Sequence, residues 1–349
     1  MSPAGAPADH YRARDFEIGE QLARLTLGMD RLFRQETEAG VRQEEEGLVP
    51  VDLSGLEPLP IRSWAEAALQ LEELDEAVGG LGNTPGGNAP RGKMLRESLR
   101  LQYLGEMIGS LRTMCAWFAG QEVPFPVKVQ RLLGVDSRRV PGSVLDDMKR
   151  ELQRLLAGMG YRGELASQVR AFEEDGALTE EEVVSTMREL LGEAAARTHE
   201  MVIPLPEFPS IDPVLVRDVP YTAYCDYRAS KIYLNADVRF TRAALKHLAA
   251  HEAFPGHYTH LLIREHLCRQ GMMPLDGALV VTDTVSSPIF EGIAEQGIHL
   301  IDWVEDDSDA AGILLARLRS ACGLNAAHMM HVQGKTEEEV AGYLRREAF

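Results

Sequence analysis

Hydrophobic positions with helical spacing dominate the chain up to about residue 200. Over residues 12–45, apolar side chains recur at intervals that place them on one face of a helix. These side chains are Ile18, Leu22, Leu25, Leu27, Met29 and Leu32. Ser63 and Thr179 each stand three residues before a glutamate, a capping-box spacing that marks a helix start. Further helices are predicted over residues 63–78, 93–118, 127–134, 142–158 and 179–199. The sequence therefore predicts a helical N-terminal lobe over residues 1–200.

The pattern changes near residue 200, where prolines and alternating side chains replace the helical spacing. Residues 203–209 are predicted to form an extended linker. Earlier in the chain, residues 79–92 are predicted to form a surface loop. Both segments are rich in residues that break helices. Residues 230–235 alternate and are β-branched or aromatic, so they predict a strand. Shorter strands are possible at residues 214–224 and 279–281, and helices are predicted over residues 288–304, 308–333 and 336–348. We expect a mainly α protein whose second lobe, residues 201–349, carries a small β element.

Composition narrows the class of protein and its partners. The 349 residues include 45 % hydrophobic, 26 % charged and 6 % aromatic side chains, which is typical of a soluble globular protein with a sizeable core. The net charge of −18 argues against nucleic acid or an anionic membrane as a partner. No stretch is apolar for long enough to span a bilayer, and the start lacks a signal-peptide core. The four cysteines show no paired spacing, so we predict reduced thiols and a cytoplasmic location.

One stretch, from His251 to His257, places polar groups inside an apolar segment. Its sequence is His-Glu-Ala-Phe-Pro-Gly-His. Two imidazoles and a carboxylate are costly to bury unless something binds them, and a divalent metal is the usual answer. On an ideal helix, six residues correspond to about 600°, which would separate the two rings. Pro255 lacks a backbone donor and Gly256 permits an unusual backbone, so we predict a local bulge that returns His257 to the side of His251.

A metal site needs a third protein ligand, and Glu291 is the best candidate. It lies 34 residues after His257, in the sequence Phe-Glu-Gly-Ile-Ala-Glu on the next apolar helix. His251, His257 and Glu291 together predict a zinc site with an open position. We interpret Glu252 as the general base, which takes a proton from zinc-activated water and passes it to the leaving amine. Glu295, one turn after Glu291, is predicted to orient a ligand histidine.

Each of these residues also has a structural interpretation. The two histidines and their carboxylate could form a buried polar cluster satisfied by backbone groups. Glu291 and Glu295 could be carboxylates favoured by the start of a helix. We interpret His247 as structural and His260 as a second-shell or surface residue. The presence of Glu252 argues against a site that has lost its catalytic activity, because a protein without turnover has no need of a general base.

The motif resembles that of a known family. His-Glu-x-x-Pro-Gly-His followed by Glu-Gly-x-Ala-Glu is similar to the pattern of the bacterial DUF885 family, whose members resemble gluzincin metallopeptidases. The resemblance covers about residues 220–340 and extends to His331 in His-Val-Gln-Gly-Lys-Thr-Glu-Glu. It implies a gluzincin-like fold in which His331 approaches the site and stabilises the oxyanion of a tetrahedral intermediate. It also implies that the strand at residues 232–235 pairs with an extended substrate, and that Tyr224 or Tyr233 supplies a phenolic donor.

The chain departs from that family near the expected cleft. Ile293 stands where members commonly carry tryptophan, and residues 323–330 lack the family's arginine and Asp-Thr-Gly. His328 is an alternative to His331 as the cleft histidine. These departures concern the substrate more than the metal. We therefore predict a zinc-dependent hydrolase of peptide amide bonds. The alternatives are a zinc enzyme of the same fold that acts on a small-molecule amide in secondary metabolism, and a non-catalytic scaffold.

Overall fold

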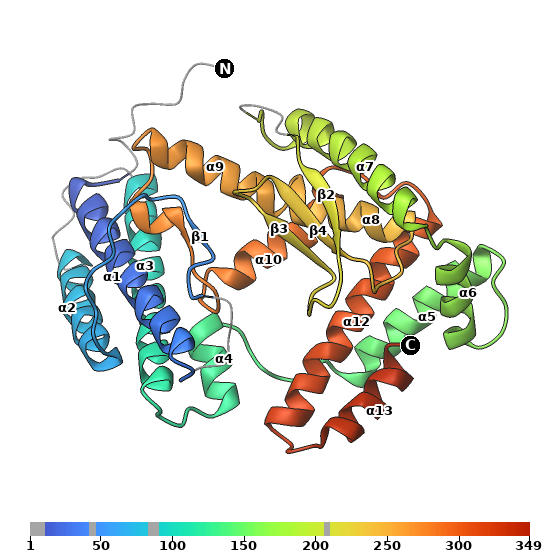
Figure 1. Ribbon diagram of the computed structural model, residues 1–349, viewed down its shortest axis with the longest axis horizontal. Coiled ribbons are helices and arrows are strands. Elements are labelled where there is room, and N and C mark those ends of the chain that lie inside the picture. Colours follow the sequence, from blue (N-terminus) through green and yellow to red (C-terminus); the bar gives the residue numbers. More distant parts are fainter. Residues whose placement is uncertain (1–10, 42–46, 83–90, 206–209) are drawn as a thin grey trace. The chain divides into compact units, whose positions relative to one another are not determined.

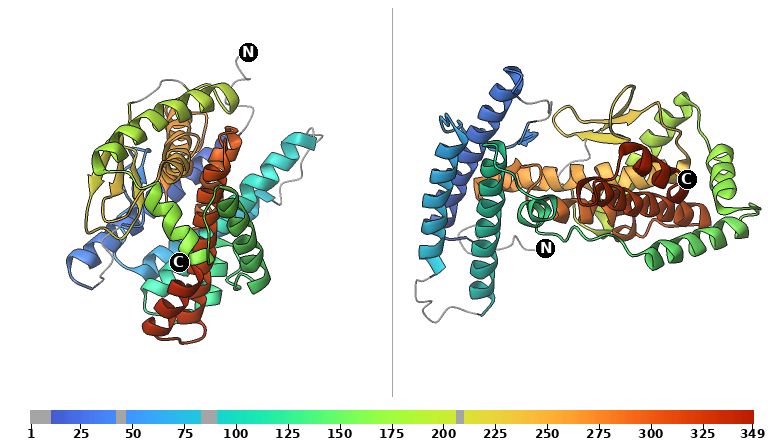
Figure 2. Two further views of the ribbon diagram at one scale, coloured as in Figure 1. Left: turned by 90° about the vertical axis from the view of Figure 1, so that its right-hand side faces the viewer. Right: turned by 90° about the horizontal axis from the view of Figure 1, so that it is seen from below.

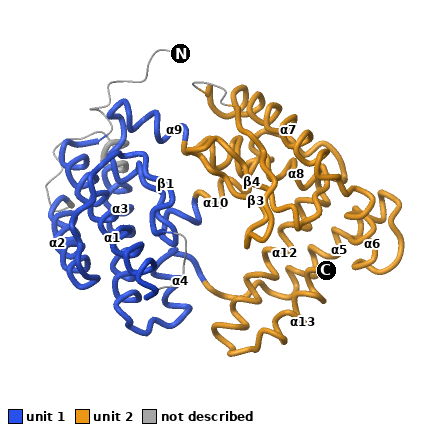
Figure 3. Tube along the Cα trace, viewed as in Figure 1, with its two compact units in different colours: residues 1–136, 262–289 blue, residues 137–261, 290–349 orange. Residues whose placement is uncertain are grey.

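The computed structural model describes residues 11–41, 47–82, 91–205 and 210–349 (Figure 1). The chain divides into two compact units, of which unit 1 comprises residues 1–136 and 262–289, and unit 2 comprises residues 137–261 and 290–349 (Figure 3). This division differs from the predicted boundary near residue 200. That boundary followed a change in composition, whereas the helix before residue 200 packs with the strand and helix after it. Both units are therefore discontinuous in sequence.

Unit 1 consists of helices that pack on one another and a two-stranded antiparallel ribbon. Its elements are α1 (Ala13–Glu38), β1 (Val51–Asp52), α2 (Trp64–Gly82), α3 (Arg91–Phe118), α4 (Phe125–Leu133), the 3₁₀ helix η3 (Leu275–Ala278) and β5 (Leu279–Val280). The core contains fully buried Ile18, Leu71 and Leu104. Arg100 binds Asp276 with two contacts of 2.7 Å, although 176 residues separate them. This buried ion pair ties the returning segment to the first helices.

Unit 2 is mainly helical and contains a three-stranded sheet (Figures 1 and 2). Its elements are α5 (Gly142–Gly158), α6 (Leu165–Asp175), α7 (Glu180–Met201), β2 (Asp212–Val216), β3 (Ala223–Asp226), β4 (Lys231–Asn235), α8 (Arg242–Leu248), α11 (Gly297–Leu300), α12 (Asp307–His331) and α13 (Glu337–Glu347). The sheet order is β2-β4-β3, with β2 parallel and β3 antiparallel to β4. Helices α9 (His257–Arg269) and α10 (Ser287–Glu295) begin in one unit and end in the other. None of the described helices has the length and apolar character needed to cross a membrane.

The mainly α class and several element boundaries are confirmed. Thr179 and Thr336 cap α7 and α13 with complete capping boxes, and the strand predicted at residues 230–235 is β4. The helix predicted over residues 288–304 is wrong in one respect, since it breaks at Gln296 into α10 and α11. Helix α6 was not predicted. Parts of four predicted segments, at residues 1–10, 42–46, 83–90 and 206–209, lie outside the described residues.

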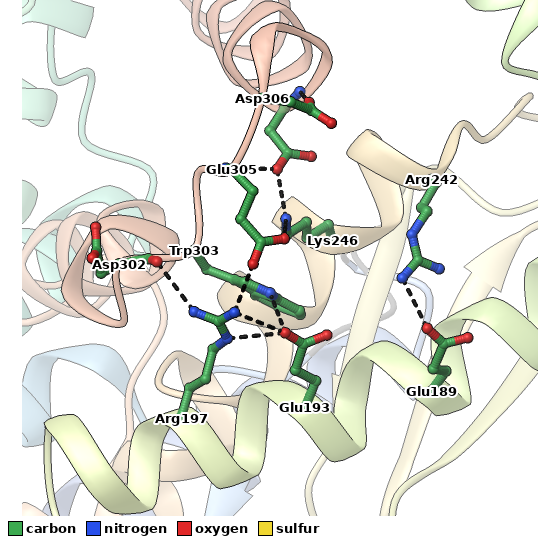
Figure 4. Close-up of polar contacts among 10 residues, drawn as sticks. Glu189, Glu193, Arg197, Arg242, Lys246, Asp302, Trp303, Glu305 and Asp306 are labelled. Carbon is green, nitrogen blue, oxygen red and sulfur yellow. Dashed lines mark hydrogen bonds and ion pairs between the residues drawn. The ribbon is translucent and has the colours of Figure 1, made fainter.

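A buried lysine anchors helix α8, which leads into the histidine motif. The Lys246 ammonium donates to Glu305 at 2.7 Å (Figure 4). It also donates to Asp309 at 2.5 Å. It also lies 5.1 Å from the centre of the Trp303 ring, whose indole nitrogen donates to Glu193 of α7 at 2.9 Å. Lys246 and Asp309 are both buried. The network therefore holds α8 between α7 and the start of α12.

We expect Lys246→Met to lower the free energy of unfolding by about 3 kcal/mol, because it leaves the Asp309 carboxylate buried without its cation. The matched control is Arg242→Met on the same helix. Arg242 pairs with Glu189 at 2.8 Å, but both side chains are more than half exposed, so a change within about 1 kcal/mol is expected. Chemical denaturation followed by circular dichroism measures both. Equal losses in the two variants would contradict the anchoring role.

Candidate metal centre

The backbone between His251 and His257 leaves the α-helical path. Helix α8 ends at Leu248, and residues Ala249–Ala253 form a π-helix. The Phe254 amide then donates to the Ala249 carbonyl at 3.1 Å, and the Gly256 amide donates to the Ala250 carbonyl at 2.9 Å. These bonds span five and six residues instead of the four of an α-helix. The predicted bulge is confirmed, and α9 begins at His257.

Gly256 is required because two parts of the backbone meet there. A Cβ atom at this position would lie 1.7 Å from the carbonyl oxygen of His251 and 2.6 Å from that of Ala250. No side chain fits such a gap. The sequence prediction gave this glycine a different role, a backbone excursion open to few other residues. Its role in the structure is to let the carbonyl of His251 pass close by.

The bulge brings His251, His257 and Glu291 together. Their two imidazole centroids lie 4.9 Å apart. Nε2 of His251 lies 3.5 Å from Glu291 Oε2, and Nε2 of His257 lies 3.4 Å from Glu291 Oε1. In a tetrahedral site with bonds of about 2.0–2.1 Å, ligand atoms are about 3.3–3.4 Å apart. Both nitrogen–oxygen distances therefore fit a metal ion that has a further position open, and one ligand atom from each of the three side chains lies within 4.8 Å of the others.

A second cluster shares His251. Glu295 Oε2 lies 3.4 Å from Nε2 of His247 and 3.5 Å from Nδ1 of His251. Both nitrogens are buried, and neither forms a hydrogen bond of ordinary geometry within the described part of the chain. Glu295 thus faces the ring nitrogen of His251 that points away from Glu291, which suits the predicted orienting role.

The sequence prediction gave His247 a structural role and missed its place in this cluster. His247 precedes His251 by four residues, and Glu291 precedes Glu295 by four. On two neighbouring helices, this repeated spacing puts two histidines opposite two glutamates. That coincidence of spacings is the signal by which the second cluster could have been found.

Charge in the two clusters favours a cation. Burial lowers the pKa of His251, but the carboxylates of Glu291 and Glu295 outweigh it and raise the pKa to about 10. In turn, His251 and His257 hold the pKa of Glu291 well below its usual range, and His247 and His251 do the same for Glu295. The two carboxylates therefore favour a positive charge at His251. A divalent cation would satisfy the same carboxylates.

Glu252 stands beside the clusters and belongs to neither. Only 8 % of its surface is exposed. Burial raises the pKa of Glu252, although the positive charges of His251 and His257 oppose the effect. The carboxylate of Glu252 also acts on Cys225 of β3. Burial, and to a lesser extent the charge of Glu252, raise the pKa of the Cys225 thiol. The cysteine is therefore a protonated neighbour of the site, and Glu252 is the carboxylate suited to proton transfer.

The order of strands in the sheet contradicts the predicted pairing of a substrate backbone with β4. The resemblance implied that the strand at residues 232–235 pairs with substrate, but β4 lies between β2 and β3 and both its edges are occupied. Strand β3 is an edge strand of this sheet and contacts the π-helix that carries Glu252. The predicted role can pass only to an edge strand such as β3.

The two tyrosines proposed as phenolic donors lie on the other face of the sheet. Tyr224 and Tyr233 are directly opposite each other, and their rings stack at 6.5 Å. Side chains alternate along a strand, so Cys225 and the fully buried Ile232 point to the opposite face, toward Glu252. The structure therefore does not place Tyr224 or Tyr233 at the centre.

The C-terminal histidines also stand apart from the centre. His331 is exposed and ends α12. It lies 11 residues beyond Ser320, the last α12 residue that lines a cavity beside His251, or about 16 Å along the helix. His328 Nδ1 lies 3.2 Å from the carbonyl oxygen of Ser137. The structure does not bring either histidine to the clusters, against the oxyanion role that the resemblance implied for His331.

His260 lies at the edge of the first cluster. Its ring centroid is 5.6 Å from that of His257, and it stacks on the ring of Phe290 at 4.6 Å. Phe290 directly precedes Glu291 in the sequence. The stack therefore joins α9 to α10 beside the proposed ligands, as expected for a residue just outside the ligand set.

A cavity of about 420 Å³ adjoins both clusters within unit 2. Its lining includes His247, His251, Glu252 and Glu295, and other lining residues come from α6, α8, α12 and the segment before α8. This volume lies within the range of small-molecule pockets. A ligand in the cavity would therefore contact the residues proposed for catalysis.

Comparison of the chain with family models, with curated proteins and with solved structures gives no match. The geometry of unit 2 and the motif itself are therefore the grounds for inferring a function.

Proposed function

We propose that the protein is a zinc-dependent hydrolase that cleaves amide bonds. The observation that carries the proposal is that the Glu291 carboxylate lies 3.5 Å from His251 Nε2 and 3.4 Å from His257 Nε2, with buried Glu252 beside them. Two neutral nitrogens and one carboxylate oxygen are the ligand set of many catalytic zinc sites. The resemblance to DUF885 proteins agrees with this function.

Different residues of the chain have different roles in the proposed hydrolysis. His251, His257 and Glu291 would hold the zinc, which supplies a Lewis acid that lowers the pKa of a water molecule and polarises the amide carbonyl. Glu252 accepts the proton of the attacking water and later donates it to the leaving nitrogen. Its burial suits this task, because a raised carboxyl pKa brings proton acceptance and donation closer in energy.

A screen of substrates tests the proposal. Zinc-loaded protein is incubated with a peptide library and with a set of small-molecule amides, and the products are identified by mass spectrometry. We expect cleavage of amide bonds that disappears with a chelator and returns with zinc. Complete absence of cleavage by zinc-loaded, folded protein would contradict the proposed function.

The cavity favours a second candidate within the same chemistry, a hydrolase of small amides. A long groove along β4 would favour peptides, but β4 is the central strand. The pocket beside His251 and Glu252 has the size of a small ligand. The screen separates the two, because a small-amide hydrolase leaves the peptide library intact. Extended peptides would instead require an edge strand such as β3.

We expect Glu295→Gln to weaken zinc binding about 10–100-fold while the protein stays folded. The carboxylate that faces His247 and His251 becomes an amide, which can no longer accept hydrogen bonds with a full negative charge. Competition with a zinc-sensitive chelating dye measures the affinity. Glu189→Gln, at an exposed position on α7, is the control and should bind zinc as the wild type does. Unchanged affinity in Glu295→Gln would rule out the orienting role.

A further inference from the structure

We infer that the cavity of unit 2 binds a bulky apolar group of the substrate next to the amide bond that is cleaved. The inference rests on the proposed function and adds a substrate class to it. The cavity measures about 420 Å³, and its lining includes His251 and Glu252. A group that enters it therefore lies beside one of the proposed zinc ligands and beside the proposed base.

The walls of the cavity are mostly apolar. Phe172 of α6, Phe240 from the segment before α8, and Leu315 of α12 are buried side chains that line it. Ala244 of α8 and Ala316 of α12 line it as well and keep it wide, because each side chain is a single methyl group. Aromatic and aliphatic walls of this kind gain free energy from apolar surface that leaves water.

The charged residues of the wall do not call for an anionic ligand. Arg319 lines the cavity, but its guanidinium forms two bonds with Glu173, at 2.7 and 3.1 Å, and a third with the Ala348 carbonyl at 3.2 Å. Its charge is thus compensated within the protein, and the guanidinium of Arg239, which also lines the cavity, lies 4.0 Å from the Glu174 carboxylate. Glu252 and Glu295 in the lining are carboxylates and would repel an acidic group. Apolar walls and compensated charges together favour an aromatic or branched aliphatic group.

Three simple hydroxamates, which bind zinc through the same headgroup, test the inference on zinc-loaded protein. They are acetohydroxamate, hydrocinnamic hydroxamate and succinic monohydroxamate, with a methyl, a phenyl and a carboxylate tail. We expect the phenyl compound to bind about 10–100-fold more tightly than the methyl compound, as burial of one aromatic ring implies. The carboxylate compound should show no such gain. Isothermal titration calorimetry measures all three without turnover.

Ala316→Phe should fill the cavity and reduce this preference to about threefold or less, while acetohydroxamate binds as before. Arg317→Phe is the matched control, because it adds the same ring to the next, exposed position of α12 and should keep the preference. Ala316→Val adds less volume and should give an intermediate loss, so the series remains informative even if the phenylalanine variant fails to fold.

The outcomes separate this inference from the proposed function. If acetohydroxamate and its phenyl analogue bind equally to the wild type, the cavity does not select an apolar group, while the zinc site stands. Tightest binding of the carboxylate compound would also overturn the inference. If no hydroxamate binds to zinc-loaded protein, the proposed zinc centre fails, and the substrate assignment fails with it. Persistence of the phenyl preference in folded Ala316→Phe would locate the binding elsewhere.

Discussion

Replacing Glu252 by glutamine should reduce amide hydrolysis about 10²–10⁴-fold while zinc binding is kept. Glutamine has nearly the same shape, but it cannot accept the proton of the attacking water. Glu252 lies outside the set of His251, His257 and Glu291 that would hold the metal, so the substitution removes no ligand. The side chain is buried, so water has little access to the position to replace the carboxylate as a base. Steady-state kinetics and zinc analysis on the same preparation measure the two properties.

The control for this prediction is Cys225→Ala. Cys225 lies near Glu252 and its thiol has a raised pKa, so it is protonated and takes no part in proton transfer. We expect the variant to retain activity within about threefold, as for a neutral neighbour. If Glu252→Gln keeps more than a tenth of the wild-type rate, another group is the base. If it loses zinc as well, Glu252 belongs to the ligand set.

The local structure of the motif could be predicted from the sequence because its causes are local. Pro255 and Gly256 disturb the backbone wherever they stand in a helix, and the bulge between His251 and His257 follows from them. The capping box predicted at Thr179 is local in the same sense and is confirmed. The match of Glu291 to the two histidines required one further assumption, that the next apolar helix packs beside the first.

The features that could not be predicted depend on contacts between distant segments. The strand at residues 231–235 is central because β2 and β3 pair with its two edges. The alternation of side chains within one strand does not indicate whether other strands pair with it. The unit boundaries are non-local for the same reason, as the pairing of Arg100 with Asp276 illustrates. The change in composition near residue 200 marks the point in the sequence where strands begin. It does not mark a boundary between the two units.

His331 shows how a match of sequence letters can mislead. The resemblance placed this residue at the oxyanion because the downstream element has the family's order of residues. In the structure, α12 continues from Asp307 to His331, and its cavity-lining residues end at Ser320. At 1.5 Å per residue, the distance along a straight helix is set by the count of residues alone. His331 therefore lies about 16 Å further along the axis.

Zinc should stabilise the protein through Glu291, and this is the second large effect. The wild type is expected to bind about one zinc ion per chain in its three-ligand site. Free zinc at about 100 times its Kd should then raise the free energy of unfolding by about 2.7 kcal/mol, because the ion binds the folded state. Glu291→Ala leaves His251 and His257 without their shared carboxylate and should lose most of this stabilisation. Calorimetric melting in zinc-buffered solutions measures it.

Glu252→Gln is the matched control for that measurement, since it changes a neighbouring glutamate that belongs to neither cluster. It should show the full zinc-dependent shift in Tm. The contrary result is equally specific. If Glu291→Ala keeps both its zinc and its stabilisation, the ion must be held by other side chains. His247, His251 and Glu295 are then the alternative set, because they are the second group within the described residues whose ligand atoms lie close enough together. Adding His247→Ala to Glu291→Ala would decide between the two clusters, since His247 belongs only to the second cluster and the added change releases only an ion held there.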